Sequence, residues 1–295
     1  MRLKKELEIR TGQKFVSTNL VFRNFSEEYL SWYVTMYPSS FFRSEQIIRQ
    51  HLMPVFEFVA LDEIKIRMAD QYMVARKRAG AKSGTIIKEM RVLKAMLNQA
   101  LRWEYLDKDP LKNLQLPKSL DSKPPRFYTP EELETIYCWA PYNWHWWRLM
   151  ANTGLRRKEA LQLEWGHIDS DKINILSTEQ DRSKSGLWRP VPLSSGARYA
   201  LKRFERDRVD DYVFPRVNRN SLSRAFDRVV TRADIAEPKG SLHCLRHTFA
   251  STLVQKGVPL RVIQKLLGHA DYTTTERYAH LAPDFLHQVV TDLEI

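Results

Sequence analysis

Apolar residues recur at steps of three and four residues from position 22 to position 116, which is the period of amphipathic helices. One such face comprises Phe22, Phe25, Tyr29, Trp32, Tyr33 and Met36, and a longer one comprises Ile86, Met90, Leu93, Leu97, Ala100 and Leu101. Faces of this kind are typical of a core rather than of a cofactor site. The pattern therefore predicts a small helical domain at residues 18 to 117, after a short N-terminal tail at residues 1 to 17.

A polar segment, KSLDSKPPRF at residues 118 to 127, follows the helical pattern and has the composition of an interdomain linker. Directly after it, Thr129, Pro130 and Glu132 have the order of a helix N-terminus with a capping box. We therefore expect a second domain at residues 128 to 295 that begins with a helix.

The second domain is predicted to be mixed. Residues 172 to 176 and 187 to 193 carry β-branched and aromatic residues on either side of a polar segment, which indicates a hairpin. Helices follow: one capped by Ser241 that runs through Val254, one from Pro259 to Gly268, and a shorter one at residues 273 to 279. The expected fold class is mainly α with a small antiparallel sheet (α+β).

Charge narrows the class of partner, because 47 Lys and Arg oppose 35 Asp and Glu, a net charge of +12. Residues 1 to 126 hold 23 basic and 14 acidic side chains, a net of +9, and the rest hold 24 and 21, a net of +3. A polyanion is the expected partner, and nucleic acid is the leading candidate. The basic residues placed to follow its phosphates in the first domain are Arg76, Lys77, Arg78, Lys82, Lys88, Arg91 and Lys94.

Other classes are disfavoured. The cysteines, Cys138 and Cys244, are too few for a disulfide framework, and the start MRLKKELEIR lacks the apolar core of a signal peptide. No apolar run approaches the roughly 20 residues of a membrane span. We therefore expect a cytoplasmic protein.

Four separated segments carry side chains suited to holding a phosphodiester during nucleophilic attack. In TGLRRKEALQLEW (153 to 165), Gly154 can end a helix and Arg156 can grip a phosphate at the start of the next. In RSKSGLWRPVPL (182 to 193), Lys184 lies near the hairpin tip. Arg182 and Arg189 lie close by, and we expect them to contact DNA as well.

The third and fourth segments supply histidines and a tyrosine. In LHCLRHTFAS (242 to 251), His243 and Arg246 share one helix face. In LLGHADYTTTERYAHL (266 to 281), His269 follows a helix-ending glycine and Tyr278 comes nine residues later. Each residue alone has an ordinary explanation as a surface charge or a packing residue, but the ordered set does not.

This set, R-x-x-E after TGL, a hairpin lysine, H-x-x-R, LLGH and the tyrosine of RYAH, resembles the tyrosine recombinase (phage integrase) family. HLMPVFE, LDEIK and TIIKEMRVLKAMLNQALRWEYLDKDP likewise resemble the helical core-binding domain of phage integrases. The resemblance implies a core-binding domain and a catalytic domain that close around duplex DNA. It also implies a site-specific recombinase that works through a covalent 3′-phosphotyrosyl intermediate. Such an enzyme is expected at the nucleoid of a bacterial cell or a phage-infected host.

The resemblance implies a role for each matched residue: Arg156 and Arg246 clamp the phosphate, Tyr278 is the nucleophile, Lys184 the general acid, His243 the proton acceptor for the tyrosine, and His269 a hydrogen-bond donor to a non-bridging oxygen. A free tyrosine has a pKa of about 10, so cations and a base must assist its attack at neutral pH. Two guanidiniums can stabilise the charge that develops on phosphorus oxygens, so neither metal nor ATP is expected.

The expected partners are a specific DNA site, further copies of the chain in a synaptic tetramer, and an accessory protein that bends DNA, in the integration or excision of a mobile element. Two alternatives remain: a DNA-binding protein of the same fold without turnover, and a topoisomerase-like enzyme that nicks and rejoins. A zinc site at His243, His247, Cys244 and His269 is disfavoured, because that helix lacks the glutamate of a metalloprotease. His247 is otherwise expected to pack in the core or beside the catalytic residues.

Overall fold

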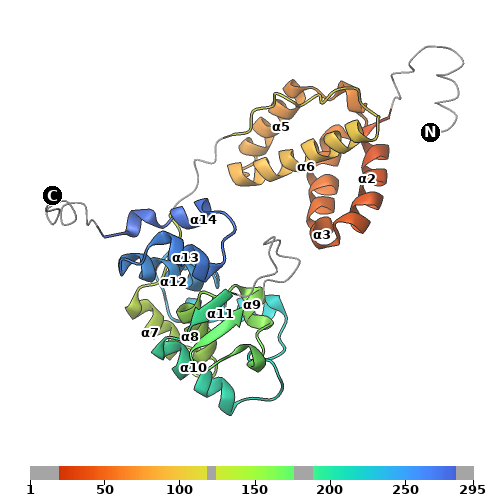
Figure 1. Cartoon of the computed structure of the whole chain (residues 1–295). Coiled ribbons are helices and arrows are strands. Elements are labelled where there is room, and N and C mark those ends of the chain that lie inside the picture. Colours follow the sequence, from red (N-terminus) through yellow and green to blue (C-terminus); the bar gives the residue numbers. More distant parts are fainter. Residues whose placement is uncertain (1–19, 118–123, 176–188, 284–295) are drawn as a thin grey trace, which may run out of the picture. The chain divides into compact units, whose positions relative to one another are not determined.

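A computed structural model of the chain describes residues 20 to 117, 124 to 175 and 189 to 283 (Figure 1). The chain divides into two compact units, Met1–Ser122 and Lys123–Ile295. The described residues are mainly helical, with a two-stranded antiparallel sheet, which confirms the predicted fold class. None of the helices in these ranges is long and apolar enough to cross a membrane.

The described residues of the first unit are mainly helical. Its elements are α2 (Phe22–Met36), α3 (Pro38–Ile47), the π-helical turn η1 (Ile48–Leu52), α4 (Met53–Phe56), the 3-10 turn η2 (Leu61–Glu63), α5 (Ile66–Arg78) and α6 (Ser83–Arg102). The predicted apolar faces of α2 and α6 meet in one core, in which Phe22, Phe25, Met90 and Leu93 are fully buried. Met36 is the exception: it is the last residue of α2 and is exposed.

The second unit begins as predicted. Thr129 accepts from the backbone N–H of Glu132, and Glu132 accepts from that of Thr129, so the capping box opens α7 (Pro130–Cys138). Next comes α8 (Trp144–Thr153), which packs against α7, α10 (Ser195–Arg206) and α12 (Cys244–Gln255). The buried rings of Trp147 and Phe226 lie 5.0 Å apart in this core. The remaining elements before α12 are α9 (Arg157–Leu161), the 3-10 turn η3 (Trp165–His167) and α11 (Arg219–Arg232).

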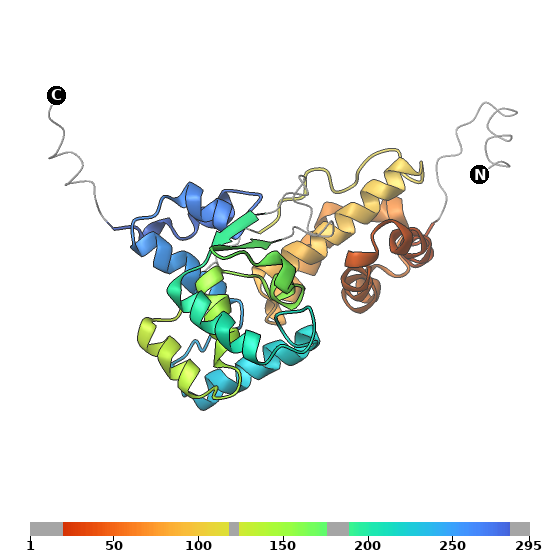
Figure 2. The same ribbon diagram turned by 60° about the horizontal axis from the view of Figure 1, so that its bottom comes forward.

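The predicted hairpin strands are β1 (Lys172–Ile175) and β2 (Arg189–Pro192), which pair antiparallel with Ile175 opposite Arg189. β2 also contacts α13 (Leu260–Leu267), so the sheet lies beside that helix (Figure 2). The segment between the strands, which contains Arg182 and Lys184, lies outside the described residues.

Three predicted helix boundaries in the last part of the chain can be compared with the structure. α13 follows Pro259 and ends at Gly268, as predicted. The prediction that Ser241 caps α12 is wrong, because a turn precedes the helix and His243 occupies the cap position. The predicted helix at residues 273 to 279 is shorter: α14 (Thr273–Glu276) is one turn, and a 3-10 turn, η4 (Ala279–Leu281), follows. Tyr278 therefore lies between two short turns.

Candidate active site

The C-terminal end of α13 gathers arginines from separate parts of the chain. The last carbonyl groups of a helix have no partner within it and carry partial negative charge. Three consecutive ones accept from one guanidinium each: Leu266 from Arg189 (2.9 Å), Leu267 from Arg246 (2.6 Å) and Gly268 from Arg156 (2.9 Å). The carbonyl groups of LLG thus bring three guanidinium groups together at the end of α13.

Glu159 supplies the charge that balances these arginines. Its carboxylate accepts from the side chain and the backbone N–H of Arg156, at 2.7 Å each, and takes two bonds from Arg189, at 2.8 and 2.7 Å. Arg246 lies 3.9 Å from the same carboxylate. Burial raises the pKa of Glu159, but the bonds and charges of Arg189 and Arg156 outweigh it and lower the pKa to about 2. Glu159 is therefore ionised at neutral pH.

Two glycines allow this close packing. Gly154, which ends α8, and Gly268 have φ values of +63° and +65°, a region that disfavours side chains. A Cβ atom on Gly154 would lie 2.6 Å from the ring of Phe249, and one on Gly268 would lie 2.9 Å from Cδ of Arg189. The carbonyl oxygen of Gly154 also accepts from Arg246 at 2.7 Å. The positive φ values and the close packing of Phe249 and Arg189 thus require the glycines of TGL and LLGH.

Two of the predicted histidines lie near these arginines. His243 is exposed at the first turn of α12. His269 is half-buried, and its Nδ1 lies 2.8 Å from Oγ1 of the buried Thr275. Burial, followed by the charges of Arg246 and Arg156, lowers the pKa of His269 to about 3, so its ring is neutral at neutral pH.

Tyr278 is buried, with 1% of its surface exposed, and packs with Ala250, Val254, Ile263 and Leu267 of α12 and α13. Its hydroxyl is 2.5 Å from Nδ1 of His247. Burial raises the pKa of Tyr278, and the charges of Arg277 and Arg246 oppose that rise in part. The histidine that touches the phenol oxygen in this structure is His247, and the proton-acceptor role of His243 stays a prediction.

Residues 127–284 match the Phage integrase family, and residues 21–116 match the Phage integrase SAM-like domain. The first match alone covers more than half of the chain. The chain belongs to the phage integrase family. It is a site-specific tyrosine recombinase, as its curated relatives are.

Several relatives and solved structures are similar to this recombinase. Tyrosine recombinase XerC of Anoxybacillus flavithermus is 28% identical over 265 residues, which cover 79% of this chain and 85% of the relative. XerD of Brucella abortus is 38% identical over 153 residues, 48% of each chain. The fold is similar to the Tn1549 transposon integrase in complex with transposon right end DNA (TM-score 0.76, 18% identity, 92% of this chain and 99% of that one). It is also similar to a lambda integrase tetramer bound to a Holliday junction (TM-score 0.74, 15% identity, 96% and 85%).

Two of the residues that we expected to contact DNA instead form ion pairs within the protein. The expectation for Arg189 is wrong for this structure, because the residue is 8% exposed and bonded to Glu159 and Leu266. Arg76 makes two bonds, of 2.9 and 2.6 Å, to the buried Glu89. Both arginines meet a buried carboxylate that their local sequence does not reveal. The exposed members of the predicted set are Lys77, Arg78, Lys82, Lys88 and Arg91.

Sequence reasoning also missed functional candidates. Glu159 was given no role, although R-x-x-E contains it, and His247 was expected in the core or beside the catalytic residues without a named partner. Sequence reasoning also passed over α11, where Arg224, Arg228 and Arg232 are exposed at steps of four and so share one face. That spacing was readable from the sequence and indicates a second basic surface.

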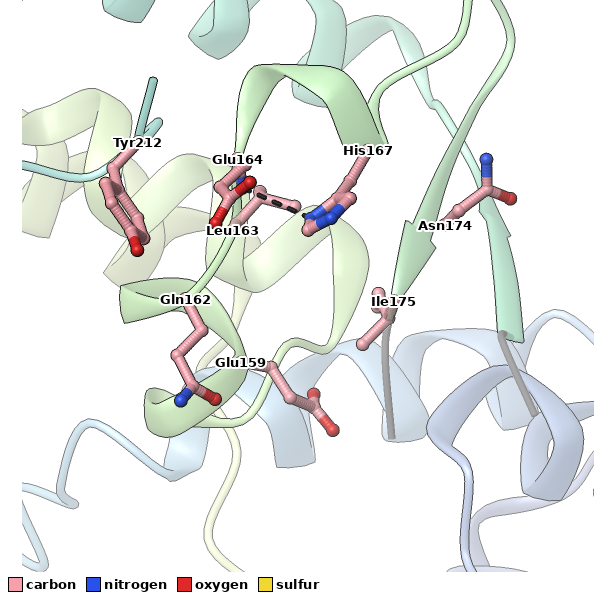
Figure 3. A pocket seen from close by; sticks show the side chains of 8 residues that line it. All are labelled: Glu159, Gln162, Leu163, Glu164, His167, Asn174, Ile175 and Tyr212. Carbon is pink, nitrogen blue, oxygen red and sulfur yellow. Dashed lines mark hydrogen bonds between the residues drawn. The ribbon is translucent and has the colours of Figure 1, made fainter. Parts of the chain in front are cut away.

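A pocket of about 280 Å³ lies on one side of Glu159 (Figure 3). It is lined by Glu159, Gln162, Leu163, Glu164, His167, Asn174, Ile175 and Tyr212. No arginine lines it, and two of the lining residues are carboxylates, so its charge does not suit a phosphate. Among the residues with defined positions, no group of three or more His, Cys, Asp or Glu side chains gathers as metal ligands do.

Glu159→Gln is expected to destabilise the second unit by roughly 3 to 5 kcal/mol, because it leaves buried guanidiniums without their counter-charge. Glu134→Gln is the control: Glu134 is exposed and pairs with Arg148 at 3.2 Å, and such surface pairs contribute about 0 to 1 kcal/mol. Thermal and denaturant unfolding measure both. Because the pKa of Glu159 falls from 4.5 to about 2 on folding, its stabilisation is full above pH 4.5. The deficit of Glu159→Gln should shrink as the pH falls toward 2, and a constant deficit would contradict the ion-pair explanation.

Proposed function

We propose that this recombinase cuts and rejoins DNA by attack of Tyr278 on a phosphodiester at a specific site. The observation that carries the proposal is the convergence of Arg156, Arg246 and His269 on the end of α13, the helix against which Tyr278 also packs. Two guanidinium groups fixed beside a neutral histidine suit a reaction in which negative charge grows on phosphorus oxygens.

The proposed reaction exchanges one ester for another. The phenol oxygen of Tyr278 bonds to phosphorus, the bond from phosphorus to the 5′ oxygen breaks, and Lys184 gives that oxygen a proton. The product is a 3′-phosphotyrosyl ester and a free 5′ hydroxyl. A 5′ hydroxyl from another strand reverses the step, and because the ester keeps the energy of the broken bond, ATP is not required.

Each predicted residue keeps a proposed role in this scheme. Arg156 and Arg246 hold the non-bridging oxygens, and His269 donates to one of them. The neutral ring of His269 can donate from Nε2 only if Nδ1 accepts, and the hydroxyl of Thr275 is placed to donate to Nδ1. His243, beside the arginines, accepts the phenol proton.

Two exposed basic surfaces support DNA binding. One carries Lys77, Arg78, Lys82, Lys88 and Arg91 on α5, on α6 and between them, and the other carries Arg224, Arg228 and Arg232 on α11. Side chains of this kind bind phosphates without reading sequence. We further propose that the protein acts in the cytoplasm, as a synaptic tetramer on DNA with an accessory bending protein, on a mobile element. The similarity to a lambda integrase tetramer bound to a Holliday junction supports the tetramer.

The test is a covalent trap. DNA flanking the gene supplies candidate sites, each made as a duplex with a nick beside the cleavage position, so that the released fragment diffuses away. Incubation in EDTA should give an adduct that survives SDS, with the nucleotide mass on the tryptic peptide that begins at Tyr278. An adduct on another peptide, or a strict need for Mg²⁺, would contradict the proposal. Joining of strands from two separate sites distinguishes recombination from nicking and rejoining alone.

A further inference from the structure

The nucleophile is inaccessible in this structure. Tyr278 is 1% exposed, and Arg246 of the phosphate clamp is 2% exposed. A phosphodiester on the outside of the protein cannot approach a phenol oxygen that is covered in this way. Tyr278 must therefore move before it attacks, and the contacts that hold it in place bear on the rate of cleavage.

His247 is the polar contact that the described residues offer to the phenol oxygen. Burial, the nearby His243 and the charge of Arg277 lower the pKa of His247 to about 3, so its ring is neutral at neutral pH. A neutral imidazole has one bare nitrogen, and in the tautomer that carries its proton on Nε2 this nitrogen is Nδ1, which can accept from the phenol 2.5 Å away. The bond satisfies a hydroxyl that would otherwise be buried without a partner, which is costly.

His247 and Tyr278 lie on elements that differ in length and in packing. His247 belongs to α12, a helix of 12 residues with Leu245, Arg246 and Ala250 buried around it. Tyr278 lies between α14 and η4, which are single turns of four and three residues. Short turns with few backbone bonds open more readily than a packed helix. We therefore expect Tyr278, rather than His247, to move.

We propose that His247 is a positioning residue that holds Tyr278 in a buried resting position, and that cleavage requires this hydrogen bond to break. The part of the proposal that concerns cleavage rests on the proposed function. The holding contact itself does not depend on it. The role differs from that of His243, whose predicted task is to accept the proton during attack.

The first readout is the accessibility of Tyr278 to N-acetylimidazole, which acetylates exposed phenols. Trypsin cleaves after Lys265 and Arg277, so Tyr278 begins one peptide and Tyr272 lies alone in the peptide before it, as an internal reference. His247→Leu removes the acceptor and keeps an apolar side chain. His247→Asn places an amide oxygen near the position of Nδ1 and so retains an acceptor.

In the full-length protein, His247→Leu should increase acetylation of Tyr278 about fivefold or more, the factor that corresponds to one ordinary hydrogen bond. His247→Asn should stay close to wild type, and Tyr272 should not change in either variant. A merely structural role for His247 would raise both tyrosines together and lower the unfolding temperature. Should His247→Leu not fold, His247→Met takes its place, because methionine fills irregular space.

The second readout is the single-turnover rate of adduct formation on the nicked duplex, which should rise by a similar factor in His247→Leu and not in His247→Asn. Unchanged protection of Tyr278 in His247→Leu would overturn the proposal. So would slower cleavage in both variants with unchanged protection, since that result identifies His247 as a proton acceptor. Greater exposure of Tyr278 without an adduct in any variant or in wild type would support the holding contact and refute the proposed function.

Discussion

Tyr278→Phe is expected to abolish the covalent adduct while leaving DNA binding close to wild type. The substitution removes the attacking oxygen but keeps the ring that packs with Val254, Ile263 and Leu267. Removal of a nucleophile lowers the rate of such reactions by roughly 10⁴-fold or more. Adduct formation under single-turnover conditions and an electrophoretic mobility shift measure the two properties.

Tyr272→Phe is the matched control for this experiment. Tyr272 lies in the same segment, half-buried, with the guanidinium of Arg261 4.5 Å from its ring centre. Its substitution should leave the adduct rate at the wild-type value. An adduct formed by Tyr278→Phe at the wild-type rate would show that another residue attacks the phosphate.

Lys184→Ala is expected to slow cleavage by roughly 10² to 10⁴-fold, the usual contribution of a positioned general acid. Replacing the bridging 5′ oxygen by sulfur makes the leaving group a thiolate, whose conjugate acid has a pKa of about 8.5 and scarcely needs a proton donor. The variant should therefore recover on the sulfur substrate. Arg156→Ala should not recover, because its proposed role concerns the non-bridging oxygens, which the sulfur leaves unchanged.

The contacts of the hairpin residues narrow the alternatives to Lys184 as the general acid. Arg189 on its second strand is bound to Glu159 and is not free to act as an acid. Lys184 and Arg182 lie in the segment outside the described residues, so the sulfur substrate decides between them. Rescue of Arg182→Ala in place of Lys184→Ala would move the acid to Arg182.

Signals within a few residues were sufficient for most helix ends and for the strands. The capping box at Thr129, the glycine ends at Gly154 and Gly268, and the β-branched residues of the hairpin all act on their own backbone, so each was predictable. The prediction that Ser241 caps α12 was wrong because a serine one turn before a helix cannot be distinguished in sequence from a serine at its N-cap.

Pairings between distant segments were not predictable in the same way. Arg189 lies in the sequence LWRPVPL, and nothing near it indicates the buried ion pair that it forms with the distant Glu159. His247 presents the same problem: its H-x-x-x-H spacing with His243 fits metal binding, packing and a bond to Tyr278 equally well. The packing of α13 against α12 determines which of these roles His247 takes, and that packing cannot be read from any short stretch of sequence.

The three carbonyl groups at the end of α13 make the active site an all-or-none structure. Their arginine partners come from the start of α9, from β2 and from α12, so the cluster exists only when all three have docked on α13. A chain still being synthesised, or one whose hairpin has come loose, lacks the charge arrangement that the chemistry requires. Completed folding of this unit is therefore a condition of the proposed reaction, because Arg156 and Arg246 reach their positions only in the docked arrangement.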